Sequence, residues 1–315
     1  MAMNLNAIHT LEMSRDEWLK ERTKGIGGSD AGIILGLNKY RTAFELWLEK
    51  TSQVDPIEID NEAIYWGNEM ENVVAKEFEK RTDKKVRRSN FMYSHPNHHF
   101  IKANVDRLVV GESAVLECKT ASAYLAKEWK DDEIPDTYLV QVQHYLGVTG
   151  KQKGYIAVLI GGNKFVWKEV TRDEDLINMI FQAEINFWNN HVLANVPPPL
   201  DGSSAAEKYL KEKYDRAVKD KEVVLPSEFK DYLIEYEQIK QNEKLIKTAK
   251  TEIENILKEE LKDAERGIVG DFVINWKNQS RTSVDSKTLK EKFPDIHKEV
   301  LKTSSFRKFD VKEVR

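Results

Sequence analysis

The sequence predicts an α/β core, a small mixed sheet flanked by helices, followed by a mainly helical extension. In the first part of the chain, stretches with helical spacing of apolar residues alternate with short runs typical of strands. Three consecutive prolines and an Asp-Gly-Ser-Ser turn then interrupt this pattern. Beyond residue 205 the spacing is helical over a much longer stretch. We therefore expect a domain over residues 1–196, a linker over 197–206 and a helical extension over 207–315.

Two of the helices expected in the first domain begin at capping signals. Ser14 and Glu17 form a capping box, in which each side chain accepts the other residue's backbone N–H. Ser29 or Asp30, at the end of the glycine-rich turn over 25–30, can cap the next, short helix. The expected helices cover about residues 14–19, 29–35, 43–50, 62–82, 135–149 and 173–192.

Four short runs rich in β-branched and aromatic residues are expected to be strands. The first two are joined by Gly111-Glu-Ser113 in a hairpin, and the last two pair across Gly161-Gly-Asn163. The expected strands cover residues 100–110, 114–119, 153–160 and 165–170.

The extension is expected to contain one long helix over about residues 227–263. Apolar residues from Tyr232 to Ile253 recur every seven positions, but the complementary positions are apolar only at the ends. This half seam favours a helix docked on another surface over a long dimeric coiled coil. A strand over 268–276, a lysine-rich helix over 287–301 and a basic tail follow. The basic residues of the tail are Lys302, Arg307, Lys308, Lys312 and Arg315.

Composition excludes several classes of protein. The 315 residues are ample for a core, and they contain neither a run of 18 apolar residues nor a signal-peptide pattern, so we expect a cytosolic protein without membrane contact. The single cysteine, Cys118, excludes a disulfide framework, a four-cysteine zinc site and a cysteine-ligated iron–sulfur cluster. Residues 1–200 carry 24 basic and 29 acidic side chains. Any nucleic-acid contact there must therefore be local or helped by metal ions.

Two carboxylates and a lysine are expected to converge on one face of the first hairpin. Side chains alternate along a strand, so Glu117 and Lys119 point to one face while Cys118 points to the other. Asp106 on the neighbouring strand can reach the first face. Such hard oxygen ligands suit Mg²⁺, and the lysine can orient or help to deprotonate an attacking water. The simpler interpretation is a solvated cross-strand ion pair, but the apolar neighbours of Glu117 favour a buried carboxylate, which needs a partner.

Two helices offer further polar groups to this face. Glu71 lies on the same helical face as Gly67 and can complete a metal shell, with Glu69 as a rival candidate. The simpler interpretation is a solvated helix face. Gln141 lies four residues before Tyr145 on one helix face and can position a phosphate or a water. Here the simpler interpretation is an amphipathic helix that packs on the core.

Two other motifs favour no chemistry. The cluster of His95, His98 and His99 lacks a fourth ligand and fits a solvated turn better than a metal site. The glycines of Gly25-Ile-Gly-Gly28 follow no strand, as a dinucleotide-binding fingerprint would require.

The candidate motifs occur in a recognisable order. They are Arg22-Thr-Lys-Gly-Ile-Gly-Gly-Ser-Asp-Ala31, Trp66-Gly-x-x-x-Glu71, Asp106 with Glu117-Cys-Lys119, and Gln141-Val-Gln143. As a set they resemble the YqaJ-type viral recombinase family, the phage λ-exonuclease branch of the PD-(D/E)XK nucleases. The resemblance covers roughly residues 14–195. Asn104-Val-Asp106 stands where the superfamily has its Pro-Asp, but the metal requires only the aspartate.

The resemblance implies a restriction-endonuclease-like PD-(D/E)XK core and a Mg²⁺-dependent alkaline deoxyribonuclease, with Mn²⁺ as an alternative metal. It implies 5′→3′ digestion of one strand of linear double-stranded DNA. The 3′ single-stranded tail would serve a single-strand annealing protein of the RecT/Redβ kind in phage or prophage recombination. A homo-oligomer, which is a ring-shaped trimer in the λ-type enzyme, and a cytoplasmic location in a bacterial host are implied as well.

Residue roles follow from the same resemblance, position by position. It assigns catalysis to Asp106, Glu117, Lys119 and Gln141. It assigns metal binding to Asp106, Glu117 and Glu71. Arg22 and Ser29 match residues that grip a terminal 5′-phosphate, and Gln141 is a further candidate for DNA contact. An arginine fork, a hydroxyl and glycine-rich backbone N–H groups form a chemically sensible phosphate cradle.

Two alternative functions stay open at this point. One is a structure-selective endonuclease of the same superfamily. The other is a non-cutting DNA- or protein-binding module on a nuclease fold, against which the joint presence of Asp106, Glu117 and Lys119 argues. The single cysteine excludes a RecB-like nuclease with an iron–sulfur cluster. The extension is expected to serve DNA contact, oligomer contact or docking of the annealing protein.

Overall fold

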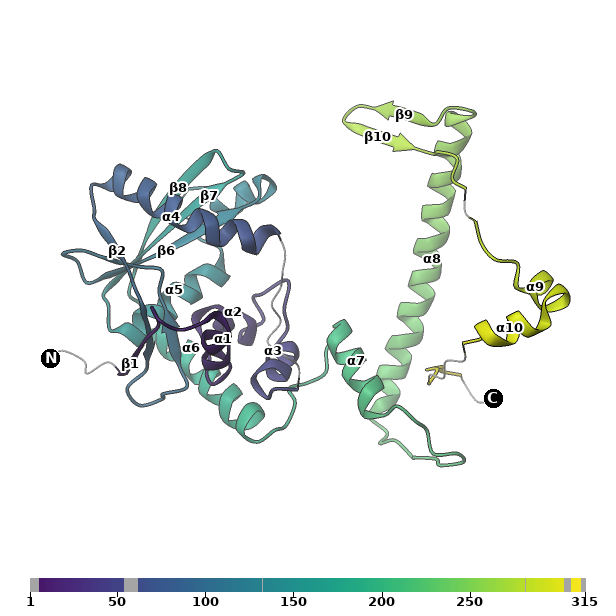
Figure 1. The fold of residues 1–315 in the computed structure, drawn as a ribbon, viewed down its shortest axis with the longest axis horizontal. Helices are drawn as coiled ribbons and strands as arrows, with labels where there is room; N and C mark the ends of the chain where they lie inside the picture. The colour runs from purple at the N-terminus through teal and green to yellow at the C-terminus, as the bar shows by residue number, and fades with distance from the viewer. Residues whose placement is uncertain (1–5, 54–61, 132, 281, 303–306, 313–315) are drawn as a thin grey trace. The chain divides into compact units, whose positions relative to one another are not determined.

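The computed structural model describes residues 6–53, 62–131, 133–280, 282–302 and 307–312. The chain divides into two compact units, Met1–Lys213 and Tyr214–Arg315 (Figure 1). Arg315 of the expected basic tail lies outside the described residues. Across the described ranges, no helix is long and apolar enough to cross a membrane.

A five-stranded sheet forms the centre of the first unit. Its strands lie in the order β2 (Val86–Arg88), β5 (Arg107–Val109), β6 (Ala114–Ala121), β7 (Lys153–Ile160) and β8 (Lys164–Thr171). All neighbours are antiparallel except β6 and β7, which run parallel because the chain crosses over between them. The crossover contains a 3₁₀ helix, Ala123–Trp129, and helix α5 (Asp136–Thr149). Both expected hairpins are confirmed as β5–β6 and β7–β8.

The strand expected over residues 100–110 is in fact two strands in two sheets. Strand β4 (Lys102–Asn104) belongs to a separate antiparallel sheet with β3 (Phe91–Ser94) and β1 (Asn6–His9), neither of which the sequence predicted. The chain leaves that sheet at Asp106. There the side-chain Oδ2, rather than a backbone carbonyl, accepts the N–H of Cys118 on β6 at 2.8 Å. This side-chain contact directly precedes the pairing of β5 with β6, and it divides a run of residues that looks like one continuous strand.

Two layers of helices cover the central sheet (Figure 1). Helix α4 (Glu62–Thr82) packs on one face, and α5 with α6 (Glu174–Phe187) packs on the other. Side chains of β6 alternate between the layers, since Leu116 packs with α4 and Val115 with α5. Helix α6 continues as a π-helical turn, Trp188–Leu193, so the helix expected over 173–192 is confirmed with a change of winding.

The N-terminal helices lie as expected, but one cap differs. They are α1 (Arg15–Thr23), α2 (Gly28–Ile34) and α3 (Ala43–Lys50). The capping box of Ser14 and Glu17 is confirmed. Neither Ser29 nor Asp30 caps α2, because Gly27 holds the N-cap position. Asp30 lies three residues later, and its Oδ2 accepts the N–H of Gly27 at 3.0 Å.

A short helix, α7 (Ser204–Lys213), closes the first unit. Ala206 is buried, and the ring of Tyr209 meets that of Phe44 edge-on, with 5.3 Å between centroids. The structure thus groups residues 204–213, at the end of the expected linker and the start of the expected extension, with the first unit.

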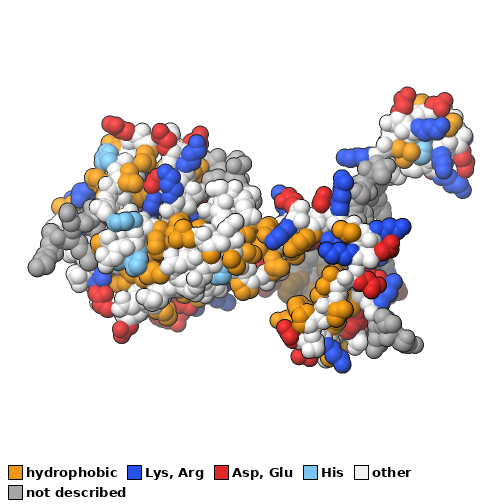
Figure 2. Space-filling model, turned by 90° about the horizontal axis from the view of Figure 1, so that it is seen from below, with side chains coloured by type: hydrophobic (Ala, Val, Ile, Leu, Met, Phe, Trp, Pro, Cys, Tyr) orange, Lys and Arg blue, Asp and Glu red, His pale blue; other side chains and the backbone are white. Residues whose placement is uncertain are grey.

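The second unit is built on the 33-residue helix α8 (Phe229–Leu261), which confirms the expected long helix. Among its large apolar side chains only Leu261 is buried, and residues such as Ile246 and Ile253 are exposed. Figure 2 shows apolar side chains reaching the surface of the molecule. The half seam expected from the sequence is therefore present on α8 as an exposed apolar face.

Two elements after α8 differ from expectation. The strand expected over 268–276 is a hairpin of β9 (Arg266–Val269) and β10 (Phe272–Asn275), because Gly270 adopts a positive φ of 53° and turns the chain back. The helix expected over 287–301 is two helices that meet at a proline, which lacks the N–H needed to continue the first. They are α9 (Ser286–Lys292) and α10 (Pro294–Val300).

Candidate active site

Glu117 lies at the centre of the site, on the face of β6 that is turned toward α5. Its side chain is 3% exposed, and Oε1 accepts hydrogen bonds from Nζ of Lys119 at 2.6 Å and Nε2 of Gln141 at 2.7 Å. The other oxygen, Oε2, is buried and has no hydrogen-bond partner among the described residues. Burying a charged oxygen without a partner is costly. This atom is therefore the clearest structural sign that the site receives a ligand.

Asp106 supplies a second carboxylate on the same face. It directly precedes β5, whose first residue, Arg107, pairs with Leu116 of β6, so Asp106 continues the register opposite Glu117. Burial, and then the negative charge of Glu117, raises the pKa of Asp106 well above its usual range. Two carboxylates that repel each other in this way are stabilised by a cation between them.

Lys119 is the cation of the site. Its side chain is 24% exposed, and its Nζ lies 5.4 Å from the ring centroid of Tyr138. Burial by itself favours the neutral amine, but Glu117 and Asp106 outweigh burial and raise the pKa of Lys119 above its usual value. Lys119 is therefore an ammonium group, suited to orient a water and to stabilise negative charge on a phosphate.

This arrangement fits a divalent cation with oxygen ligands. Asp106 and Glu117 converge on one face, and Oε2 of Glu117 is available to bind. Mg²⁺ in proteins commonly takes one or two carboxylates and completes its shell with waters and phosphate oxygens. Within the described ranges, no three His, Cys, Asp or Glu side chains form a complete metal site by themselves. Water and substrate oxygens would complete the shell of an ion bound by Asp106 and Glu117.

Glu71 lies beside the carboxylate pair but is held by arginines. It forms an ion pair with the buried Arg107, and its Oε1 lies 3.6 Å from Nη2 of Arg88. After burial and Glu117, its charge also raises the pKa of Asp106. The rival candidate, Glu69, is exposed. Of the two, Glu71 is the carboxylate near the site, and its role as a metal ligand stays a prediction that requires release from Arg107.

Helix α5 brings Gln141 and Tyr145 to the site from the facing layer. Nε2 of Gln141 donates both to Glu117 and to the hydroxyl oxygen of Tyr145, the latter at 2.8 Å. Burial, and then Glu117 and Asp106, raises the pKa of Tyr145 well above its usual range. The phenol therefore keeps its proton. Since its oxygen accepts from Gln141, its own O–H remains a donor that can face a ligand.

The glycine-rich turn and α1 bring Arg22 and Ser29 together. Nη2 of Arg22 donates to Oγ of Ser29 at 3.4 Å, and the guanidinium lies 4.8 Å above the ring of Trp18. The turn is fixed to the chain just before β4, since Ile26 N–H donates to the carbonyl of Phe100 at 2.7 Å. Arg22 is half-buried and Ser29 is exposed, so a ligand can reach both.

Tyr145 links the two halves of the site. A Cβ placed on Gly28 would lie 2.5 Å from Cε1 of Tyr145, so only glycine allows α2 to lie this close to α5. The charge of Arg22 also acts on the Tyr145 phenol. The predicted phosphate cradle and the carboxylate pair are thus neighbours across this one ring.

A model of the YqaJ-like viral recombinase domain matches residues 17–152. The chain is also 55% identical over 305 residues to the YqaJ protein of Bacillus subtilis (strain 168), with 96% of each chain covered. This chain belongs to the YqaJ-like viral recombinase family.

Solved structures relate the fold of this YqaJ family member to nucleases. An alkaline exonuclease from Laribacter hongkongensis, LHK-Exo, has a TM-score of 0.50 and 20% identity, over 63% of this chain and 97% of that chain. Its complex with dAMP gives the same TM-score at 21% identity and the same coverage. At these identities the likeness concerns the fold, and it confirms the expected PD-(D/E)XK-like α/β core.

Tyr145 has only a weak signal in the sequence of this YqaJ family member. It lies four residues after Gln141, but a tyrosine on an amphipathic helix is more often a core residue. The three histidines of the 95–99 loop form no metal cluster in the part of the chain that is described. Instead, Nδ1 of His95 accepts the backbone N–H of His98 at 3.1 Å, as in a turn.

Proposed function

We propose that this protein is a Mg²⁺-dependent deoxyribonuclease that digests linear double-stranded DNA from its 5′ ends. The observation that carries the proposal is the buried, unpaired Oε2 of Glu117 beside Asp106 and Lys119. Two acidic ligands and an ammonium group on one face are what phosphodiester hydrolysis needs. Membership of the recombinase family and the exonuclease fold support the same activity.

Asp106 and Glu117 would hold the metal, with Glu71 as a third ligand if Arg107 releases it. When bound, Mg²⁺ lowers the pKa of an attacking water and neutralises charge on the scissile phosphate. Lys119 keeps an ammonium proton directed at the reacting oxygens. Gln141 fixes the carboxylate of Glu117, since its amide donates to Oε1 and leaves Oε2 for the metal. The hydroxyl of Tyr145, held by Gln141, is placed to donate to a phosphate oxygen.

The pocket of Arg22 and Ser29 supports the choice of the 5′ end. A terminal phosphate carries more negative charge than an internal one, and it can accept from a guanidinium, a hydroxyl and backbone N–H groups at once. The pocket adjoins the carboxylate pair through Tyr145. A 5′-phosphate held there would set the first phosphodiester beside Lys119. Digestion of one strand in this direction leaves a 3′ single-stranded tail.

The wider proposal concerns partners. The exposed apolar face of α8 supports contact with another protein, either a single-strand annealing protein or further copies of this chain in a homo-oligomer such as a ring-shaped trimer. The proposal places the enzyme in the cytoplasm of a bacterial host, where linear DNA from phage or prophage recombination occurs. Mn²⁺ is expected to replace Mg²⁺, because both accept carboxylate and water oxygens.

The test is digestion of a linear duplex labelled at either its 5′ or its 3′ end, with Mg²⁺ or with EDTA. Wild type should release the 5′ label as mononucleotide only with Mg²⁺. Lys119→Ala should slow this release by about a thousandfold, because it removes the positive charge at the reacting phosphate. Lys153→Ala is the matched control, since Lys153 is a half-buried lysine on the adjacent strand, paired with Glu169.

Three outcomes would contradict the proposal. Release of the label in internal fragments would indicate a structure-selective endonuclease. Mononucleotides released first from the 3′ end would reverse the polarity. Binding without cleavage of linear, nicked or branched DNA would make a non-cutting binding module the better account.

A further inference from the structure

The last turn of α1, which carries Arg22, is bonded by two buried lysines. Carbonyls at a helix C-terminus have no partner within the helix. Here Nζ of Lys102 donates to the carbonyl of Glu21 at 3.1 Å, and Nζ of Lys50 donates to the carbonyl of Arg22 at 3.2 Å. The two ammonium groups come from β4 and α3, which are far from α1 in the sequence. They therefore fix this turn to the body of the unit.

Lys50 joins the two sides of the predicted phosphate pocket. Its side chain is 1% exposed, and besides the carbonyl of Arg22 it binds Oδ2 of Asp30 at 2.8 Å. Asp30 follows Ser29 in α2, so one ammonium group holds the backbone of Arg22 and the neighbour of Ser29. Burial by itself raises the pKa of Asp30, but Lys50 and then Arg22 lower it to about 2. The carboxylate is therefore charged, and the pair is a true ion pair.

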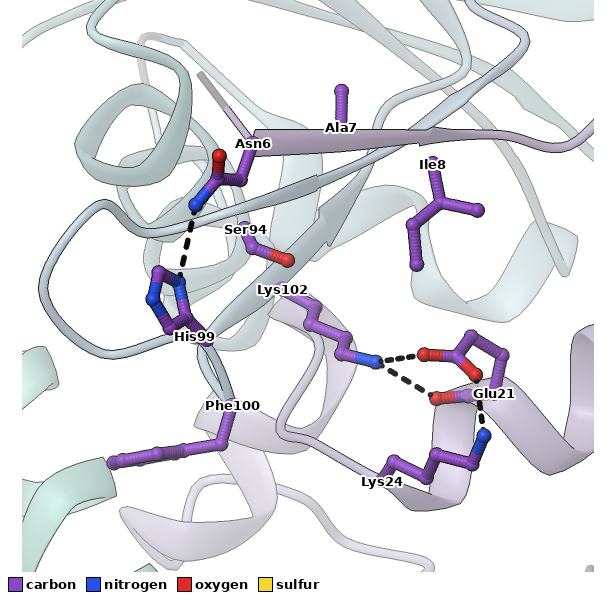
Figure 3. A pocket seen from close by; sticks show the side chains of 9 residues that line it. All are labelled: Asn6, Ala7, Ile8, Glu21, Lys24, Ser94, His99, Phe100 and Lys102. Atoms are coloured by element: carbon purple, nitrogen blue, oxygen red, sulfur yellow. Dashed lines mark hydrogen bonds and ion pairs between the residues drawn. The ribbon is translucent and has the colours of Figure 1, made fainter. Parts of the chain in front are cut away.

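Lys102 reaches Glu21 of α1 from β4 (Figure 3). It is 8% exposed, and its Nζ binds Oε1 of Glu21 at 2.7 Å in addition to the carbonyl of the same residue. Its own backbone N–H donates to the carbonyl of Ile26 in the glycine-rich turn at 2.8 Å. Its backbone carbonyl bonds Nε2 of His144, the residue before Tyr145, at 2.8 Å. Lys102 thus connects α1, the glycine-rich turn and α5.

Stability alone is a poor reason for these contacts. Replacing a buried ion pair with apolar residues of similar volume is often neutral or stabilising. What charged partners add is a fixed geometry, because each ammonium satisfies a particular carbonyl and a particular carboxylate at once. Both sets of bonds end on the backbone of residues 21–22 and beside the turn that holds Ser29.

We propose that Lys50 and Lys102 are positioning residues that fix Arg22 and Ser29 for recognition of a terminal phosphate. This inference rests on the proposed 5′-phosphate pocket. Without the lysines, the last turn of α1 is free to shift, and the separation of Arg22 from Ser29 is no longer set. Recognition of the phosphate then weakens, while the carboxylate site on β6 keeps its own bonds to Gln141 and Lys119.

The experiment compares kcat/KM on duplexes with a 5′-phosphate and with a 5′-hydroxyl, at saturating Mg²⁺. Lys50→Met is combined with Asp30→Asn, so that no charge is left buried alone, and the oxygen of the introduced amide can still accept from Gly27. Lys102→Met is the second variant, because Glu21 keeps its pair with Lys24 at 2.8 Å. Lys168→Met is the matched control. That buried lysine also donates to backbone carbonyls, including Asp131 at 2.7 Å, but it lies on β8.

The ratio of the two kcat/KM values is the decisive quantity. Arg22→Ala should bring it close to one. Lys50→Met/Asp30→Asn and Lys102→Met should each lower it at least about fivefold, mainly through a higher KM on the phosphorylated end, since one charge-assisted contact is weakened. Lys168→Met should keep the wild-type ratio. If the double variant does not fold, the result for Lys102→Met decides.

The failures are distinguishable. If Arg22→Ala leaves the ratio unchanged, the phosphate pocket itself is wrong, and the proposed function loses its 5′-end assignment. If Arg22→Ala lowers the ratio but the lysine variants slow both substrates equally, the lysines are merely structural and only the present inference is overturned.

Discussion

Two buried carboxylates in the same unit, Asp30 and Glu117, each bind an ammonium group and an N–H donor through one oxygen but differ in the other oxygen. Asp30 has its ammonium partner and a backbone N–H on the same oxygen, and together with Lys50 it holds backbone in place. Glu117 binds Lys119 and Gln141 through one oxygen and leaves the other unpaired. Burial and charge are alike in both, so they do not separate structure from chemistry. The second oxygen does, because among the described residues Oε2 of Glu117 is buried without a hydrogen-bond partner, whereas neither oxygen of Asp30 is.

A third buried carboxylate limits this conclusion. Glu184 also has an unpaired Oε2, and its Oε1 lies 2.7 Å from Nδ1 of His144. The other ring nitrogen of His144 donates to the carbonyl of Lys102, which can only accept. Glu184 therefore belongs to the network that supports the phosphate pocket. An unpaired oxygen marks a ligand site only where, as at Glu117, a second carboxylate and an ammonium group share its face.

The largest expected effect comes from removing the charge of Glu117 while keeping the shape of its side chain. Glu117→Gln keeps the shape and an acceptor for Lys119, but removes the charge that binds a metal. Cleavage should fall by about a thousandfold or more. The temperature of unfolding without metal should stay the same or rise, because the substitution removes a costly buried charge. Initial rates and thermal melts of the two proteins in EDTA check both parts.

The metal dependence of stability sharpens the same test. Mg²⁺ should raise the unfolding temperature of wild type, because it binds the folded state, and should not raise that of Glu117→Gln. Strong destabilisation of Glu117→Gln in EDTA would contradict the comparison, since Glu117 would then be a structural residue like Asp30.

A smaller effect is expected from acid at the Asp30–Lys50 pair. The pKa of Asp30 is lowered from 3.8 to about 2 in the folded state. A lowered folded pKa stabilises the protein above the unfolded value, so this stabilisation is complete above 3.8 and is lost as the pH falls toward 2. The loss amounts to about 2 kcal/mol. Urea unfolding of wild type and Lys50→Met/Asp30→Asn from mildly acidic pH down to about pH 2 measures it.

The double variant is the control for wild type in this experiment, because it lacks the carboxylate that titrates. Its stability should fall with pH by about 2 kcal/mol less than that of wild type over this range. Parallel curves of unfolding free energy against pH for the two proteins would show that Asp30 titrates normally. Asp30 would then not be a carboxylate that is stabilised by its partners, and its contrast with Glu117 would be wrong.

The central sheet and the carboxylate site could be predicted from the sequence, whereas most of the contacts that support them could not. Alternation along β6 correctly separated Glu117 and Lys119 from Cys118, and the capping box located α1. The break within residues 100–110 could not be predicted, because it depends on a side-chain bond from Asp106 to another strand. The hairpin of β9 and β10 was missed although Gly270 lies within it.

The positioning lysines show a further limit of sequence analysis. Lys50 ends a helix and Lys102 begins a strand, and at such places a lysine is usually solvated. Their burial results from the approach of α1 to α3 and β4, which no local pattern encodes. Tyr145 was hidden for a similar reason, since its contact with Gly28 joins residues more than a hundred positions apart.

The most direct test of the central claim is anomalous diffraction from crystals soaked in Mn²⁺, for wild type and for Glu117→Gln. The account predicts a peak in wild type within coordination distance of Oε2 of Glu117 and of Asp106, and its loss in the variant. A Mn²⁺ peak that persists in Glu117→Gln, or that lies away from these carboxylates, would contradict it.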